Sequence, residues 1–127
     1  MTRPVLNQNR IHPAIQATVA DNNIDIINEV EAAIASNDIV IVGMSLNPFP
    51  KKAKKLLDGL SIEYCYLEYG GYFSLWRRRN ALKLWCGWTS FPMIFVKGML
   101  VGGATDLQAL ADSGELSTML EQATNTQ

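Results

Sequence analysis

Cysteine and histidine are scarce in this chain. Its 127 residues include two cysteines, Cys65 and Cys86, and a single histidine, His12. The wide spacing of the two cysteines excludes a disulfide-rich scaffold, a CxxC redox pair and a cysteine-based zinc site. One imidazole also excludes a site that needs several histidines. We therefore expect no metal site.

Long apolar segments are missing as well. No apolar run approaches the roughly 20 residues that a membrane-spanning helix needs. The opening segment, MTRPVLNQNRIHPAIQ, lacks the basic start and the unbroken apolar block of a secretory signal. Because 48% of the residues are apolar and 18% are charged, the composition indicates one globular domain. We expect a cytoplasmic protein without membrane contact.

Positive charge is absent from the end of the chain and concentrated in its middle. The net charge is −3 over residues 1–46, +6 over residues 47–98 and −4 over residues 99–127. A basic middle segment is compatible with an anion site, but for most of the lysines we favour two solvated helix faces. The isoelectric point of 5.7 and the lack of aromatic residues within the KKAKK run argue against nucleic acid as a partner.

The spacing of apolar residues predicts an α/β fold with its elements in a defined order. A helix from Asp25 to Ser36 precedes a continuous β-branched strand, IVIV, at residues 39–42. Asn47 is a strong N-cap candidate for the next helix, and Pro48 suits its first position. The later elements are a strand at 62–67, a helix at 72–85, strands at 92–96 and 99–101, and a last helix capped by Thr105 or Asp106.

This order predicts a four-stranded mixed sheet with helices on both faces. The helix between the first two strands makes them parallel, and the turn at Lys97-Gly98 makes the last two an antiparallel hairpin. We expect residues 23–122 to form the domain. Residues 1–22 are predicted to be a flexible N-terminal extension with a short helix after Pro13, and residues 123–127 a disordered tail.

Three segments give the chain its resemblance to a known family. They are IVIVGMSLNPFPKKAKKLL, WCGWTSFPMIFVKG and VGGATDLQALADSGEL. Together with the element order they resemble the glutaredoxin family of the thioredoxin fold, over about residues 25–120. The segment RNALKLWCGW before the second stretch is similar to the monothiol branch. The resemblance implies a thioredoxin-like α/β fold with an extra N-terminal helix.

The chain departs from that family where its chemistry takes place. The family carries C-P-x-C, or C-x-x-S, at the start of the helix that here begins Asn47-Pro48-Phe49-Pro50. Asn47 keeps a capping oxygen but supplies no thiolate, and Pro50 replaces the resolving position. We therefore expect no catalytic residue here and no iron–sulfur cluster held by this position.

The glutathione groove is what the resemblance leaves in place. It implies that Arg79 meets the glycine carboxylate and that a cis Pro92 stands beside the backbone that binds the cysteinyl part. Met44 replaces a family lysine, so one carboxylate contact is lost. The residues that match the groove are Phe49, Arg79, Ser90, Phe91, Pro92, Gly103, Thr105 and Asp106.

Three functions remain open from the sequence. The favoured one is a glutaredoxin-like protein without catalysis that binds glutathione or a glutathionylated partner in redox homeostasis. The second is an active thiol oxidoreductase that uses Cys86 or Cys65, although we interpret Cys65 as a buried structural thiol and expect a helix C-terminus to raise the pKa of Cys86. The third is a protein-interaction module that has lost the ligand.

Overall fold

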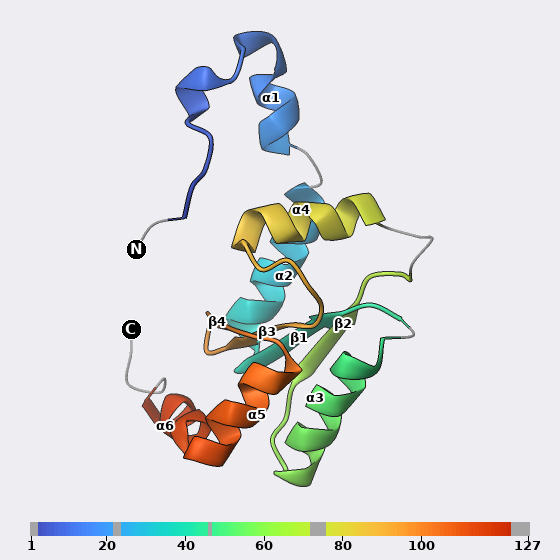
Figure 1. Ribbon diagram of the computed structural model, residues 1–127, viewed down its shortest axis with the longest axis vertical. Helices are drawn as coiled ribbons and strands as arrows, with labels where there is room; N and C mark the ends of the chain where they lie inside the picture. The colour runs from blue at the N-terminus through green and yellow to red at the C-terminus, as the bar shows by residue number, and fades with distance from the viewer. Residues whose placement is uncertain (1–2, 22–23, 46, 72–75, 123–127) are drawn as a thin grey trace.

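A central mixed sheet organises the computed structural model, which describes residues 3–21, 24–45, 47–71 and 76–122 (Figure 1). The strand order is β2-β1-β3-β4. Strands β1 (Ile39–Gly43) and β2 (Cys65–Glu68) are parallel. Strand β3 (Met93–Val96) runs antiparallel to β1 and to β4 (Met99–Gly102). The predicted four-stranded mixed sheet is confirmed.

Helices cover both faces of this sheet. Figure 1 shows α2 (Ile24–Ser36) and α4 (Trp76–Cys86) on one side. Helices α3 (Pro48–Gly59), α5 (Ala104–Ser113) and α6 (Glu115–Gln122) cover the other side. This arrangement agrees with the sequence. Strand β1 is apolar on both faces, so each face needs a cover of helices, and the right-handed crossover through α3 places that helix on one of them.

Strand β1 separates two hydrophobic cores. Val40 and Val42 point to the side of α2 and α4, where Leu82 is fully buried. Ile39 and Ile41 point to the opposite side and pack with residues of α3, α5 and α6. All five residues of β1 are buried, as the continuous β-branched run predicts.

The positions where two elements begin differ from the prediction. Strand β2 begins at Cys65, three residues after the predicted start at Ile62. Helix α5 begins at Ala104 with Gly103 as its N-cap residue, so Thr105 and Asp106 lie inside its first turn, from which the Asp106 side chain still bonds to the N-cap backbone. The predicted start of α4 at Tyr72 lies outside the described residues.

The N-terminal segment folds into two short helices, η1 (Gln8–Arg10) and α1 (Pro13–Asp21). The guanidinium of Arg3 donates to the carbonyl oxygens of Leu84 and Trp85 at the end of α4, at 3.2 and 3.3 Å. Arg3 therefore pairs two of the carbonyls that a helix end leaves free. The division into an extension and a domain stays a prediction, and the predicted disordered tail at 123–127 lies outside the described residues.

In the part of the chain that the structure describes, no helix combines the length and the apolar character needed to cross a bilayer.

Candidate functional site

The start of α3 carries the first part of the candidate site. Asn47 has extended backbone angles, and its Oδ1 accepts a hydrogen bond from the backbone N–H of Phe49 at 2.9 Å. Pro48 occupies the first helical position, where its missing N–H leaves no bond unmade. The Asn47 cap and the start of the helix are confirmed as the sequence predicts them.

The segment before β3 approaches this helix start. The peptide bond between Phe91 and Pro92 is cis, and both residues are buried. Asn47 Nδ2 donates to the carbonyl oxygen of Phe91 at 3.3 Å. One side-chain amide thus links the beginning of α3 to the residue before the cis-proline, 44 positions further along the chain.

The start of α5 supplies a third side of the site. The Asp106 carboxylate accepts a hydrogen bond from the backbone N–H of Gly103 at 2.9 Å, as an acidic residue in the third helical position commonly does. Gly102 has φ +112°, and a Cβ there would collide with Asp106. Glycine at 102 therefore lets the chain turn from β4 into α5 with the carboxylate in place.

These three segments enclose one hollow of about 260 Å³. Seven of the eight residues that the resemblance assigns to a glutathione groove line this hollow, and the eighth, Arg79, does not. The hollow is lined by Phe49, Trp88, Ser90, Phe91, Pro92, Gly103, Ala104, Thr105 and Asp106. A larger hollow of about 750 Å³ at the C-terminal end of α3 contains none of the eight.

Trp88 is a wall residue that the sequence analysis does not assign to the site. Its indole Nε1 is buried and has no hydrogen-bond partner within the described residues. A buried donor without an acceptor is unfavourable. The buried, unpaired indole N–H distinguishes Trp88 from the other wall residues, and this feature exists only once the chain is folded.

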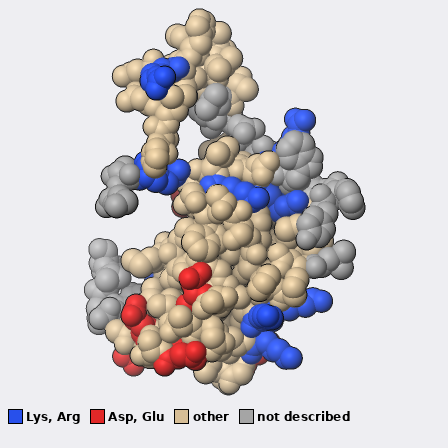
Figure 2. All heavy atoms as spheres, in the orientation of Figure 1, with Lys and Arg blue, Asp and Glu red and all other residues tan. Residues whose placement is uncertain are grey.

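Charge is distributed unevenly around the hollow. Asp106 is the one charged residue in its lining, on the α5 side. The ammonium group of Lys52 lies 5.1 Å from the centroid of the Phe49 ring, and that of Lys83 lies 5.7 Å from the centroid of the Phe91 ring. On the face drawn in Figure 2, Lys and Arg atoms lie over α3, α4 and the N-terminal segment, and the Asp and Glu atoms lie over α5 and α6.

Arg79 points into the protein instead of toward solvent. It is 7% exposed, and its Nη1 donates to the carbonyl oxygen of Tyr69 at 2.9 Å. The neighbouring Arg78 pairs with Asp25 of α2 at 2.8 Å. Arg78 and Arg79 therefore hold α4 to the rest of the fold.

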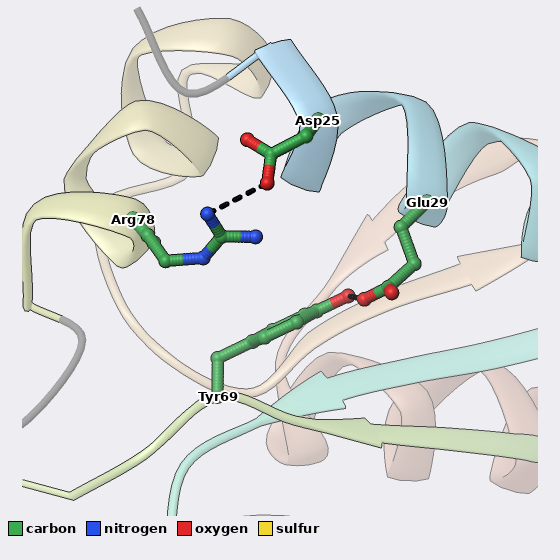
Figure 3. A network of polar contacts seen from close by, with 4 residues as sticks. All are labelled: Asp25, Glu29, Tyr69 and Arg78. Carbon is green, nitrogen blue, oxygen red and sulfur yellow. Dashed lines mark hydrogen bonds and ion pairs between the residues drawn. The ribbon is translucent and has the colours of Figure 1, made fainter.

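The same region contains a buried tyrosine with a carboxylate partner. Figure 3 shows the hydroxyl of Tyr69 donating to the Glu29 carboxylate, close to the ion pair of Arg78 and Asp25. Burial, and then the contact with Glu29, raises the pKa of the Tyr69 hydroxyl. This network joins α2, the residue that follows β2, and α4.

Neither cysteine lines the hollow. Cys86 is half-buried at the end of α4, where it accepts from the Trp88 N–H at 3.4 Å and lies 3.6 Å from the Met93 sulfur. The pKa of the Cys86 thiol is raised, in the predicted direction, but the main cause is burial and not the end of the helix. Cys65 is also half-buried, so it is more accessible than predicted. Among the described residues no group of three or more metal-binding side chains is found.

Comparison with known proteins identifies relatives that match about three quarters of the chain. A glutaredoxin-like protein of Dictyostelium discoideum is 41% identical over 98 residues, which are 77% of this chain and 80% of that protein. The mitochondrial glutaredoxin-2 of Pongo abelii is 32% identical over 101 residues. That match covers 76% of this chain and 60% of the relative, so it spans less than two thirds of the relative's length. No family model matches the chain.

Solved structures of the same kind superpose on this fold. Oxidized glutaredoxin 2 from Chlamydomonas reinhardtii has a TM-score of 0.69 at 28% identity, over 83% of this chain and 99% of that chain. A buckwheat glutaredoxin–glutathione complex has a TM-score of 0.72 at 22% identity, over 82% of this chain and 94% of that chain.

Proposed function

The chain belongs to the glutaredoxin family and has its thioredoxin-like fold, and from this membership we propose that it binds glutathione without exchanging thiols. The ligand would be free glutathione or the glutathionyl group of a modified protein. The proposed domain is residues 23–122, and the proposed role is recognition in redox homeostasis. The likeness of RNALKLWCGW to the monothiol branch stays a prediction.

One observation carries this proposal. Seven residues assigned to a glutathione groove from the sequence come from three separate parts of the chain and line one hollow. Their gathering requires the start of α3, the segment before β3 and the start of α5 to meet. A solved relative with the same fold is a glutathione complex, which supports glutathione as the ligand class.

The charges around the hollow suit glutathione. The tripeptide carries an ammonium and a carboxylate on its γ-glutamyl end and a second carboxylate on its glycine. Asp106 offers a partner for the ammonium, while Thr105 and the N-terminus of α5 offer donors for the neighbouring carboxylate. Lys52 lies beside Phe49 and Lys83 beside Phe91, and these two lysines provide positive charge for the glycine carboxylate of the tripeptide.

The absence of a thiol at the helix start is the reason to propose binding without catalysis. Thiol–disulfide exchange needs a thiolate, and Asn47 offers an amide that is already engaged in two hydrogen bonds. The alternative nucleophile Cys86 has a raised pKa and lies outside the lining of the hollow. By the same reasoning no iron–sulfur cluster is proposed at the start of α3.

The proposed compartment is the cytoplasm. Cys65 and Cys86 are both free thiols, which suits a reducing environment.

Calorimetric titration with reduced glutathione tests the proposal. We expect saturable binding by the natural chain and a decrease in affinity of roughly fivefold in Thr105→Ala, which loses one hydroxyl at the hollow. Thr118→Ala is the matched control, because this threonine is also exposed but lies on α6. Because Trp88 lines the hollow, tryptophan fluorescence provides an independent readout. No binding by the natural chain would refute the proposal.

A turnover assay with a glutathione mixed disulfide addresses the catalytic alternative. We expect no exchange above the uncatalysed rate. Exchange that disappears in Cys86→Ser or Cys65→Ser would establish the oxidoreductase instead.

A further inference from the structure

The side chain of Asn47 bonds to two walls of the hollow at once. Its Oδ1 accepts from the N–H of Phe49, and its Nδ2 donates to the carbonyl oxygen of Phe91. An amide has one acceptor end and one donor end, so both bonds form in a single orientation of the group. The helix N–H of Phe49 fixes that orientation and aims the amide nitrogen at Phe91.

The carbonyl of Phe91 is a natural contact for a peptide ligand. Phe91 lines the hollow, and the next residue, Pro92, has no N–H to offer. A peptide that lies along this segment in extended form would pair with main-chain groups, as a strand pairs with a sheet edge. In the free protein the Asn47 amide already occupies this carbonyl.

We propose that Asn47 sets the affinity of the hollow for glutathione by competing with the ligand for the Phe91 carbonyl. This inference rests on the proposed function, since it needs glutathione in the hollow. The amide N–H stands where a backbone N–H of the tripeptide would donate. Binding therefore exchanges one hydrogen bond for another and gains less than it would at a free acceptor.

The two bonds of Asn47 differ in length, and the difference indicates which one gives way. The bond from Phe49 is 2.9 Å long, within the usual range, whereas the bond to Phe91 is 3.3 Å and lies just beyond it. A ligand can displace the longer bond while the cap of α3 stays in place. The competition is thus reversible and leaves the helix intact.

Asn47→Ser separates the two roles of this residue. A serine hydroxyl keeps a good N-cap for α3 but has no amide nitrogen to place on Phe91. We expect glutathione to bind about fivefold more tightly to Asn47→Ser than to the natural chain, which corresponds to one hydrogen bond of roughly 1 kcal/mol. Alanine would remove the cap and aspartate would add a charge, so neither isolates the amide.

Asn37→Ser is the matched control. The Asn37 amide also donates to a backbone carbonyl, that of Ala33, at 2.9 Å, but it lies beyond the end of α2 and outside the lining of this hollow. We expect its glutathione affinity to equal that of the natural chain. Thermal unfolding of both variants verifies that each is folded during the titration.

The titrations separate this inference from the proposed function. Unchanged or weaker binding by Asn47→Ser overturns the inference and leaves glutathione binding by the natural chain intact. Binding by Asn47→Ser alone supports the inference and overturns the proposed function of the natural chain. Binding by neither protein overturns both.

Nuclear magnetic resonance of the side-chain amide gives a second readout. We expect the Asn47 amide protons of the free protein to exchange slowly with water, and glutathione to accelerate that exchange as the bond to Phe91 opens. Slow exchange that glutathione leaves unchanged, at saturation, would show that the ligand does not compete with Asn47 and would overturn the inference.

Discussion

Arg79 donates from its buried guanidinium to the carbonyl oxygen of Tyr69, across a distance of 2.9 Å. This contact ties α4 to the segment that follows β2. The family resemblance assigns Arg79 to the carboxylate of glutathione, yet this side chain is 7% exposed. Its position gives it a structural role that can be measured apart from ligand binding.

Replacing this arginine should therefore affect stability more than binding. In Arg79→Met the Tyr69 carbonyl loses a charged donor, and we expect the free energy of unfolding to fall by about 2 kcal/mol. Chemical denaturation measures this loss. Asn80→Ala, at an exposed position on the same helix, should change stability by less than about 0.5 kcal/mol. An Arg79→Met protein of natural stability with strongly weakened glutathione binding would instead place the guanidinium at the ligand.

Tyr69 should make the protein sensitive to alkaline conditions. Burial and the contact with Glu29 raise the pKa of its hydroxyl in the folded protein, whereas in the unfolded chain it ionises near the ordinary value of about 10. Above that pH the unfolded state binds fewer protons than the folded state, so the stability contribution present below pH 10 is lost as the pH rises.

The variant Tyr69→Phe isolates this effect. At neutral pH it should be less stable by about 1 kcal/mol, because the hydrogen bond to Glu29 is gone. The difference from the natural chain should shrink as the pH rises above 10, in denaturation curves recorded from pH 7 to 11. A constant difference across this range would show that the hydroxyl does not titrate with unfolding.

The ion pair of Arg78 and Asp25 should make the stability of the protein depend on pH under acidic conditions. The hydrogen bond from Arg78 holds the pKa of the Asp25 carboxyl below its usual range. The resulting stabilisation is complete above the ordinary carboxyl pKa of about 4 and is lost as the pH falls through the lower, folded value. Asp25→Asn should therefore lower the melting temperature slightly at pH 7 and not at pH 2. High salt should also remove the difference, because the carboxylate is exposed.

Cys86 should react slowly with alkylating reagents. Burial raises the pKa of its thiol, so a smaller fraction is thiolate at neutral pH than in a free cysteine. In a Cys65→Ser background, iodoacetamide should modify Cys86 several-fold more slowly than it modifies free cysteine at pH 7.5. Unfolding in guanidinium should restore the ordinary rate. If Cys86 of the folded protein were alkylated as fast as free cysteine, it would again be a candidate nucleophile.

The sequence predicted best where a single local rule dominates. The β-branched run of β1 and the pair Asn47-Pro48 each satisfy a strong local preference, and both elements occur as predicted. The N-cap of α5 lies before the predicted residues because it is Gly103, which has no side chain to signal a cap, whereas the predicted Asp106 contributes to the cap from the first turn. The contribution of Trp88 to the hollow was missed because a wall residue is defined by chain segments that meet only after folding.

Arg79 illustrates a different limit. Three consecutive arginines on a helix point in different directions, and their identity alone does not say which one turns inward. That choice depends on the Tyr69 carbonyl, which comes from another part of the chain. The other groove residues were grouped through the family resemblance, and the fold brings them to one hollow.

Installing a thiol at the start of α3 should create the chemistry that the natural chain lacks. In Asn47→Cys the sulfur lies at a helix N-terminus, whose free N–H groups favour the thiolate and lower its pKa. The introduced thiolate would attack the glutathionyl sulfur of a mixed disulfide and release the substrate thiolate. A second glutathione thiolate would then free the protein and form glutathione disulfide, so no resolving residue at Pro50 is needed.

The matched control for this gain of activity is Asn37→Cys, a surface thiol beyond the end of α2. We expect Asn47→Cys to deglutathionylate a peptide substrate at least tenfold faster than Asn37→Cys, since only the first thiol has both an activating helix end and an adjacent ligand hollow. Equal rates would show that the hollow does not hold a glutathionyl group within reach of α3. Because the assay needs no activity in the natural chain, it tests the placement of the ligand directly.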